Sequence, residues 1–162
     1  MIMEELKVRI PFPEGTKFKI IKPKLHELFE ETRYALDLIV EVGTPVLAVR
    51  EGKVVWVKSD SNKYFRPADL SALPLEEIKE IASKYTNGVC IKHPDGTFAE
   101  YLHLDKNVKV KVGDWVEEGE IIGYVGFSGI LEKPHLHLNI FVLSGNRAKS
   151  IPFSFNYRYK RK

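Results

Sequence analysis

Residues 134–142 read Pro-His-Leu-His-Leu-Asn-Ile-Phe-Val, and this stretch decides the predicted fold and the predicted chemistry. Leucine, isoleucine and valine alternate with other residues, which is typical of a β-strand that buries one face. Successive side chains of a strand point to opposite faces, so His135 and His137 are expected on the same face. Two imidazoles on one face can provide a metal ligand and a neighbouring group that handles protons.

Two further candidates lie upstream of this strand. A third histidine, His103, belongs to a predicted strand at 97–104, and the carboxylate of Asp37 belongs to one at 33–40. Histidines together with a carboxylate are the side chains of a small zinc hydrolase site. Tyr101 shares a face with His103 in a regular strand, so its hydroxyl group either orients that imidazole or packs in the core.

The rest of the chain reads as short strands separated by glycine turns, which predicts one all-β, mainly antiparallel domain over residues 1–162. His93 opens a Pro-Asp-Gly hairpin turn and is expected to be solvated. An inserted segment at about 59–87 carries apolar residues at helical spacing after Pro74, which predicts one short amphipathic helix. The further predicted strands are 45–49, 53–58, 88–93, 120–126 and 135–143.

Composition limits the function classes. The 162 residues carry a net charge of +3, which is compatible with an anionic polymer but predicts no specific nucleic-acid partner. The single cysteine, Cys90, excludes an internal disulfide, and no stretch has the length of a membrane span. Acidic residues near the N-terminus, with no apolar run after them, predict a cytoplasmic chain unless the sequence was trimmed from an exported protein. The absence of glutamine suggests a thermophilic source.

A set of motifs in a fixed order resembles the lysostaphin and LytM-type zinc metallopeptidases, which are peptidoglycan endopeptidases of the duplicated hybrid motif fold. The resemblance covers roughly two-thirds of the chain and implies a β-sandwich with half-barrel character. The motifs are Leu-Asp at 36–37, Gly-Thr-Pro-Val at 43–46, His-Pro-Asp-Gly at 93–96, Tyr-Leu-His-Leu at 101–104, Val-Gly-Asp at 112–114, Gly-Phe-Ser-Gly at 126–129 and Pro-His-Leu-His at 134–137.

The resemblance implies a role for each candidate. Asp37 and His137 would be ligands of one Zn²⁺ ion per chain. His103 and His135 would lie beside the metal, activate its bound water and stabilise the oxyanion of the tetrahedral intermediate. The expected activity is zinc-dependent hydrolysis of peptide bonds, with a peptide or peptidoglycan as substrate. The oligomeric state stays open.

One position departs from the family pattern. The family usually places its first zinc ligand four residues before the aspartate, where this chain has Arg33, and a guanidinium group cannot bind zinc. The chain resembles a branch of the family with Tyr-Ala-Leu-Asp, here at 34–37, and this branch implies that the upstream His26 is the third ligand. In the alternative interpretation, Arg33 forms an ion pair with Asp37, the metal site is degraded, and the protein is a binding or regulatory module.

Overall fold

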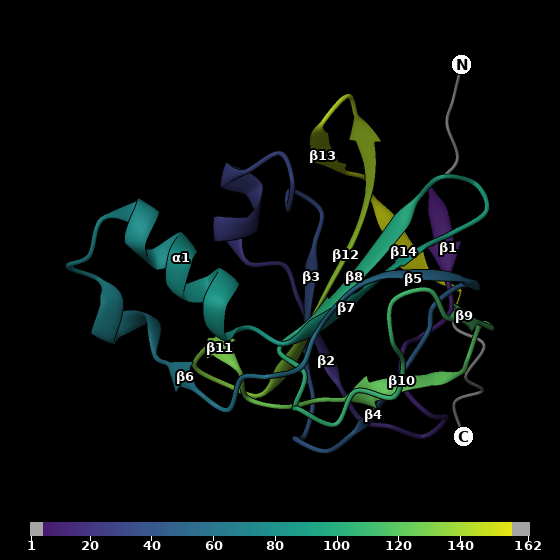
Figure 1. Cartoon of the computed structure of the whole chain (residues 1–162), viewed down its shortest axis with the longest axis horizontal. Helices are drawn as coiled ribbons and strands as arrows, with labels where there is room; N and C mark the ends of the chain where they lie inside the picture. Colours follow the sequence, from purple (N-terminus) through teal and green to yellow (C-terminus); the bar gives the residue numbers. More distant parts are fainter. Residues whose placement is uncertain (1–4, 157–162) are drawn as a thin grey trace.

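The computed structural model describes residues 5–156, and most of its regular structure is β-strand (Figure 1). In chain order the elements are β1 (Leu6–Val8), β2 (Lys19–Ile21), the 3₁₀ helix η1 (Lys24–Leu28), β3 (Leu36–Ile39), β4 (Pro45–Leu47), β5 (Gly52–Lys58), β6 (Tyr64–Phe65), the 3₁₀ helix η2 (Pro67–Leu70), α1 (Leu75–Tyr85), β7 (Gly88–Lys92), β8 (Phe98–Leu102), β9 (Trp115–Val116), β10 (Ile121–Tyr124), β11 (Gly129–Ile130), β12 (His135–Ser144), β13 (Arg147–Ser150) and β14 (Phe153–Phe155).

An eight-stranded sheet forms the framework, in the order β2-β3-β12-β8-β7-β5-β9, with β13 paired to β12. All of its pairings are antiparallel. Three two-stranded pairs complete the described part of the chain: β4 with β10 is antiparallel, whereas β1 with β14 and β6 with β11 are parallel. The prediction of a mainly antiparallel β fold with one short inserted helix is therefore confirmed.

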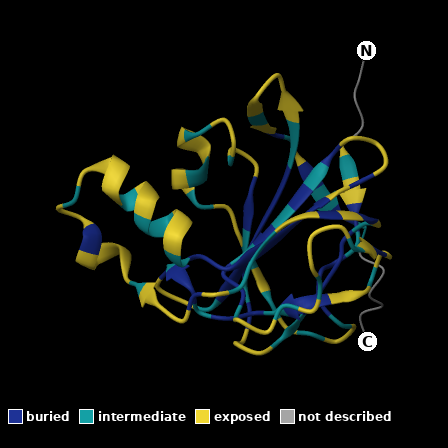
Figure 2. Ribbon diagram, viewed as in Figure 1, coloured by how far each residue is buried: buried dark blue, intermediate teal, exposed yellow. Residues whose placement is uncertain are grey.

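The central strand β12 separates the core from the site. Leu136, Leu138 and Ile140 are fully buried on one face of the sheet. Each such side chain contributes about 1.5–3 kcal/mol to stability through its burial. The alternation of side chains consequently puts His135 and His137 on the other face. Figure 2 shows the strands in dark blue where they cross the middle of the molecule.

The core behind this sheet is one cluster of buried apolar side chains contributed by both ends of the chain and by most strands. It contains Val8, Ile10, Phe12, Leu36, Leu38, Val40, Val46, Ala48, Val49, Val54, Val89, Ile91, Ala99, Tyr101, Leu104, Val116, Ile122, Val125, Leu136, Leu138, Ile140, Phe153 and Phe155.

The inserted segment holds β6, η2 and α1, and it projects away from the large sheet at the left of Figure 1. The helix α1 begins directly after Pro74, and acidic residues occupy its first turn, where they oppose the positive end of the helix dipole. No residue of α1 is fully buried. Lys79 Nζ lies 5.3 Å from the centre of the Phe29 ring, so the insertion contacts the segment that follows η1. Within residues 5–156, no helix has the length and hydrophobicity that a bilayer span requires.

Candidate metal centre

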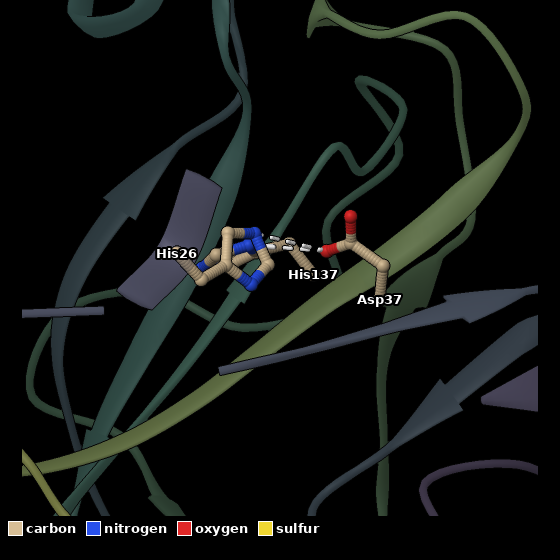
Figure 3. A group of neighbouring side chains, drawn as sticks. All are labelled: His26, Asp37 and His137. Carbon is tan, nitrogen blue, oxygen red and sulfur yellow. Dashed lines mark ion pairs between the residues drawn. The ribbon is translucent and has the colours of Figure 1, made fainter. Parts of the chain in front are cut away.

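Asp37 and His137 face each other across two neighbouring strands. In the antiparallel register of β3 and β12, Asp37 lies directly opposite His137, and Leu136 and Leu38 form the next pair. Directly opposed residues of an antiparallel pair point to the same face of the sheet. As a result His137 Nδ1 lies 3.4 Å from Asp37 Oδ1 (Figure 3).

His26 reaches the same point from outside the sheet. It belongs to η1, and its Nδ1–H donates a 2.9 Å hydrogen bond to the carbonyl oxygen of Ala35. This bond fixes the tautomer, because a carbonyl oxygen only accepts, and it leaves the lone pair on Nε2. Nε2 lies 3.5 Å from Asp37 Oδ1. One donor atom from each of His26, Asp37 and His137 thus falls within 4.8 Å of the other two (Figure 3).

Asp37 Oδ1 is buried and receives no hydrogen bond. The imidazole nitrogens of His26 and His137, at 3.5 and 3.4 Å, are too far away for good hydrogen bonds. Burial alone would raise the pKa of Asp37, but the surrounding imidazoles outweigh burial and lower this pKa. Burial and the neighbouring His137 lower the pKa of His26, so its imidazole is held neutral. An ionised carboxylate oxygen between two imidazole nitrogens suits a cation.

His103 and His135 lie beside these three side chains. Their ring centroids are 4.5 Å apart, and His103 lies 6.3 Å from His137 by the same measure. His103 Nδ1–H donates to the carbonyl oxygen of Ser128 at 2.7 Å, and His135 Nδ1–H donates to that of Lys133 at 2.8 Å. Burial, and then the adjacent His135, lower the pKa of His103 to about 3. His103 is therefore neutral, and its lone pair lies on Nε2.

His103 reaches this face by breaking the strand alternation. It has φ of 73°, in the left-handed region, and it follows the last residue of β8. Its N–H donates to the carbonyl oxygen of Asn87 at 3.0 Å, which helps to hold this backbone conformation. Gly129 leaves room for the ring, because a Cβ atom there would lie 3.3 Å from His103 Nδ1 and would also collide with Thr86.

The same break corrects the expectation for Tyr101. In the regular part of β8, Tyr101 lies opposite Leu138, so it points into the core, away from His137. Its hydroxyl oxygen accepts a 2.8 Å hydrogen bond from the N–H of Val49 and does not orient His103. Of the two interpretations, the core aromatic is the one that the structure supports.

Arg33 does not form the ion pair that the alternative interpretation required. Its side chain is exposed, in a turn that precedes β3. Among the described residues, the ion-pair partners of Asp37 are His26, His135 and His137. Arg33 stands at the usual ligand position but forms no ion pair with Asp37, so the Asp37 carboxylate faces His26 instead.

Glu100 is a site residue that the sequence analysis missed. It lies opposite Asn139 of β12, on the same face of the sheet as His137. Its Oε1 is 3.8 Å from His137 Nε2. A carboxylate near the outer nitrogen of a metal-binding imidazole favours the tautomer whose other nitrogen binds the metal, here Nδ1. The available signal was an acidic residue inside an otherwise apolar strand, on the face not taken by Tyr101.

The expectation for His93 was wrong. Its side chain is 2% exposed, and its Nδ1 lies 2.8 Å from the hydroxyl oxygen of Thr97. The hairpin turn itself is as predicted, with Gly96 at φ of 88°. His93 is buried because its ring packs inward from the end of β7 while the turn beyond it remains at the surface. Burial, and then the positive charge of Arg50, lower the pKa of His93 to about 4.

This burial predicts a pH-dependent stability. The folded pKa of His93 is about 4, below its ordinary value of 6.5, so between these values the unfolded chain binds the extra proton. The contribution of His93 to the free energy of unfolding is fully present above pH 6.5. It falls as the pH drops toward 4, by at most about 3 kcal/mol. Urea unfolding between pH 4 and 7 should show a steeper loss for the native protein than for His93→Gln. Parallel curves would contradict this assignment.

Comparisons with known proteins identify the family of this chain. The sequence pattern of peptidase family M23 matches residues 31–150. Lysostaphin from Staphylococcus staphylolyticus is 32% identical over 129 residues, covering 75% of this chain and 21% of lysostaphin. The peptidoglycan DD-endopeptidase ShyC of Vibrio cholerae is 31% identical over 106 residues, covering 65% of this chain and 19% of ShyC. The chain thus spans about a fifth of the length of these relatives.

Solved structures show the same fold. Lysostaphin from Staphylococcus simulans superposes with a TM-score of 0.54 and 25% identity, over 92% of this chain and 52% of that chain. A zinc-containing peptidase from Vibrio cholerae superposes with a TM-score of 0.50 and 26% identity, over 88% of this chain and 36% of that chain. The matched range spans most of the chain and contains the positions of Asp37, His103, His135 and His137. The chain belongs to peptidase family M23.

Proposed function

We propose that this protein is a zinc-dependent endopeptidase that hydrolyses peptide bonds in peptidoglycan cross-links. The observation that carries the proposal is the convergence of His26, Asp37 and His137 on one point, with two further histidines beside them. Three protein ligands that leave a fourth position open are typical of catalytic zinc sites, whereas structural sites have four.

The donor atoms fit zinc in type and spacing. Nitrogen and oxygen donors bind zinc at about 2.0–2.1 Å, so two ligands of a tetrahedral site lie roughly 3.4 Å apart. The distances from Asp37 Oδ1 to His137 Nδ1 and His26 Nε2 are 3.4 and 3.5 Å. The buried Oδ1 that no hydrogen bond satisfies is the atom that a cation would neutralise. A softer or larger metal would favour sulfur ligands or more oxygen ligands than this site offers.

When bound, the metal supplies Lewis acidity, which lowers the pKa of a water molecule and polarises a carbonyl group. Neutral His103 accepts a proton at Nε2, because its Nδ1–H is committed to the carbonyl oxygen of Ser128. His135, held by the carbonyl oxygen of Lys133, has its Nε2 3.6 Å from Asp37 Oδ2 and faces the same space. In its doubly protonated form, with a hydrogen on each ring nitrogen, His135 would donate a hydrogen bond from Nε2 to the oxyanion that develops on the substrate carbonyl.

The proposed substrate class rests on the similarity to characterised relatives. ShyC is a peptidoglycan DD-endopeptidase, and the family match to residues 31–150 covers the two strands that hold the candidate ligands Asp37 and His137. Fold alone would not assign a substrate, since one fold serves many functions. The similarity to a peptidoglycan DD-endopeptidase makes a peptide cross-link the first substrate to test.

The test starts with the metal. We expect about one zinc per chain by elemental mass spectrometry after dialysis against trace zinc, as a three-ligand site predicts. A chelator should abolish the release of new amino groups from peptidoglycan fragments, and added zinc should restore it. A zinc content near zero would overturn the proposal and leave a metal-free binding module. Bound zinc without cleavage of peptidoglycan fragments would overturn the substrate assignment.

A further inference from the structure

The segment that carries His26 is not held in place by its own apolar side chains. None of the residues of η1 is buried, and Leu25 and Leu28 are 65% and 72% exposed. A metal ligand on such a segment must be fixed by other contacts, because affinity depends on ligands that are already oriented.

Two buried polar side chains of the sheet provide these contacts. Asn139 Nδ2–H donates a 2.7 Å hydrogen bond to the carbonyl oxygen of Glu31, and its Oδ1 accepts one of 2.9 Å from the Ser150 hydroxyl group. The same hydroxyl oxygen accepts a 3.0 Å hydrogen bond from the N–H of Tyr34. The N–H of Ser150 donates to the carbonyl oxygen of Glu30 at 3.0 Å. Asn139 and Ser150 are 1% and 3% exposed, so these bonds are shielded from water.

These hydrogen bonds hold the turn at 30–34, and this clamped turn holds His26. Thr32 lies between the clamped positions, and its hydroxyl group donates to the carbonyl oxygen of His26 at 3.0 Å. The next anchor, the carbonyl oxygen of Ala35, accepts the hydrogen bond from His26 Nδ1. The N–H of Ala35 in turn donates to the carbonyl oxygen of Thr32 at 2.9 Å. Both ends of His26, its backbone and its ring, are thus attached to the clamped turn.

We infer that Asn139 and Ser150 are positioning residues for the ligand His26. This inference rests on the metal site proposed above and adds the part of the chain that lets His26 take the place of the ligand expected at position 33. The two side chains tie the turn at 30–34 to strands β12 and β13, so that Nε2 of His26 faces Asp37 before any metal binds. Without them the turn and His26 would sample other positions, and metal binding would have to order them.

The test is the zinc dissociation constant of the full chain, measured by competition with a fluorescent chelator. In Asn139→Asp the donor to the Glu31 carbonyl oxygen is replaced by an acceptor of the same shape. We expect zinc affinity to fall about 10- to 100-fold, the range for loss of a group that orients a ligand. Ser150→Ala, which keeps the backbone bond to Glu30, is the milder second variant and should lower affinity in the same direction.

Asn87 offers a matched control. It is fully buried, and its side chain holds the inserted segment by the same kind of bonds: Nδ2–H donates to the Ser61 carbonyl oxygen at 2.7 Å, and Oδ1 accepts from the Ser61 N–H at 3.0 Å. Asn87→Asp should lower the unfolding midpoint of the metal-free protein and leave zinc affinity unchanged. An equal loss of affinity in Asn87→Asp and Asn139→Asp would overturn the inference in favour of general destabilisation.

A double-mutant comparison tests whether Asn139 affects zinc binding through His26. In a His26→Ala background, Asn139→Asp should weaken zinc binding no further, because no ligand is left to position. A full additional loss in that background would overturn the inference and place the effect of Asn139 on Glu100, which lies 3.4 Å from it. Unchanged affinity in His26→Ala alone would overturn the positioning role yet leave Asp37 and His137 as ligands. A native protein that binds no zinc would overturn the proposed function itself.

Discussion

Replacing His103 should remove hydrolysis and leave zinc bound, whereas replacing His137 should remove both. His137 Nδ1 is one of the three converging donors, so His137→Ala leaves an incomplete ligand set. His103 contributes no donor to that set, and because its Nδ1–H is bonded to Ser128 we expect it to accept a proton at Nε2. Loss of a general base lowers the rate by about a hundredfold to ten-thousandfold.

The residue that replaces His103 should tolerate the backbone conformation at this position. Because residue 103 has φ of 73°, asparagine, which tolerates the left-handed region, is preferable to alanine. His103→Asn and His137→Ala would be compared by zinc content per chain and by initial rates on the same peptidoglycan fragments. Equal loss of zinc in both variants would contradict the division between ligand and proton acceptor. Full activity in His103→Asn would contradict its role in proton transfer.

His26→Ala should weaken zinc binding severely, and Arg33→Ala should leave it unchanged. His26 supplies Nε2 at 3.5 Å from Asp37 Oδ1, while Arg33 is exposed and forms no ion pair with Asp37. Loss of a direct ligand should exceed the roughly hundredfold loss seen when an orienting partner is removed. This pair of variants is informative because the position of Arg33 is where a ligand is expected from the family pattern.

The measurement is a zinc titration of both variants, with the unfolding of the metal-free proteins as the control for folding. Unchanged affinity in His26→Ala would return this histidine to a role outside the metal site. A marked loss in Arg33→Ala would mean that the guanidinium group supports the site in solution.

Much of the site follows from local patterns. The alternation at 134–142 places His135 and His137 on one face, and the neighbouring Leu136 and Leu138 are fully buried on the other, as the pattern requires. The predicted strand at 33–40 brings Asp37 to the same face, although the observed strand is limited to Leu36–Ile39. It begins late because the residues before it form the turn that Ser150 and Asn139 hold.

Local patterns failed where the backbone leaves regular geometry. Tyr101 and His103 share a face only in a continuous strand, and the positive φ of His103 sends the two side chains to opposite sides. His93 stands at a turn, where exposure is the usual outcome, yet its ring packs inward against Thr97. The alternation of side chains along a strand predicts neither result, because both depend on contacts with residues outside the strand.

The sequence by itself determined the β framework, the face on which the paired histidines lie and the family to which they point, because strand alternation and motif order are properties of neighbouring residues. Only the tertiary structure decided that His26 lies beside Asp37 and His137, that Arg33 stays outside this group and that Tyr101 belongs to the core. These outcomes depend on hydrogen bonds between distant parts of the chain, such as those from Asn139 to Glu31 and from Tyr34 to Ser150. Such contacts form when the sheet assembles, and no local pattern records them.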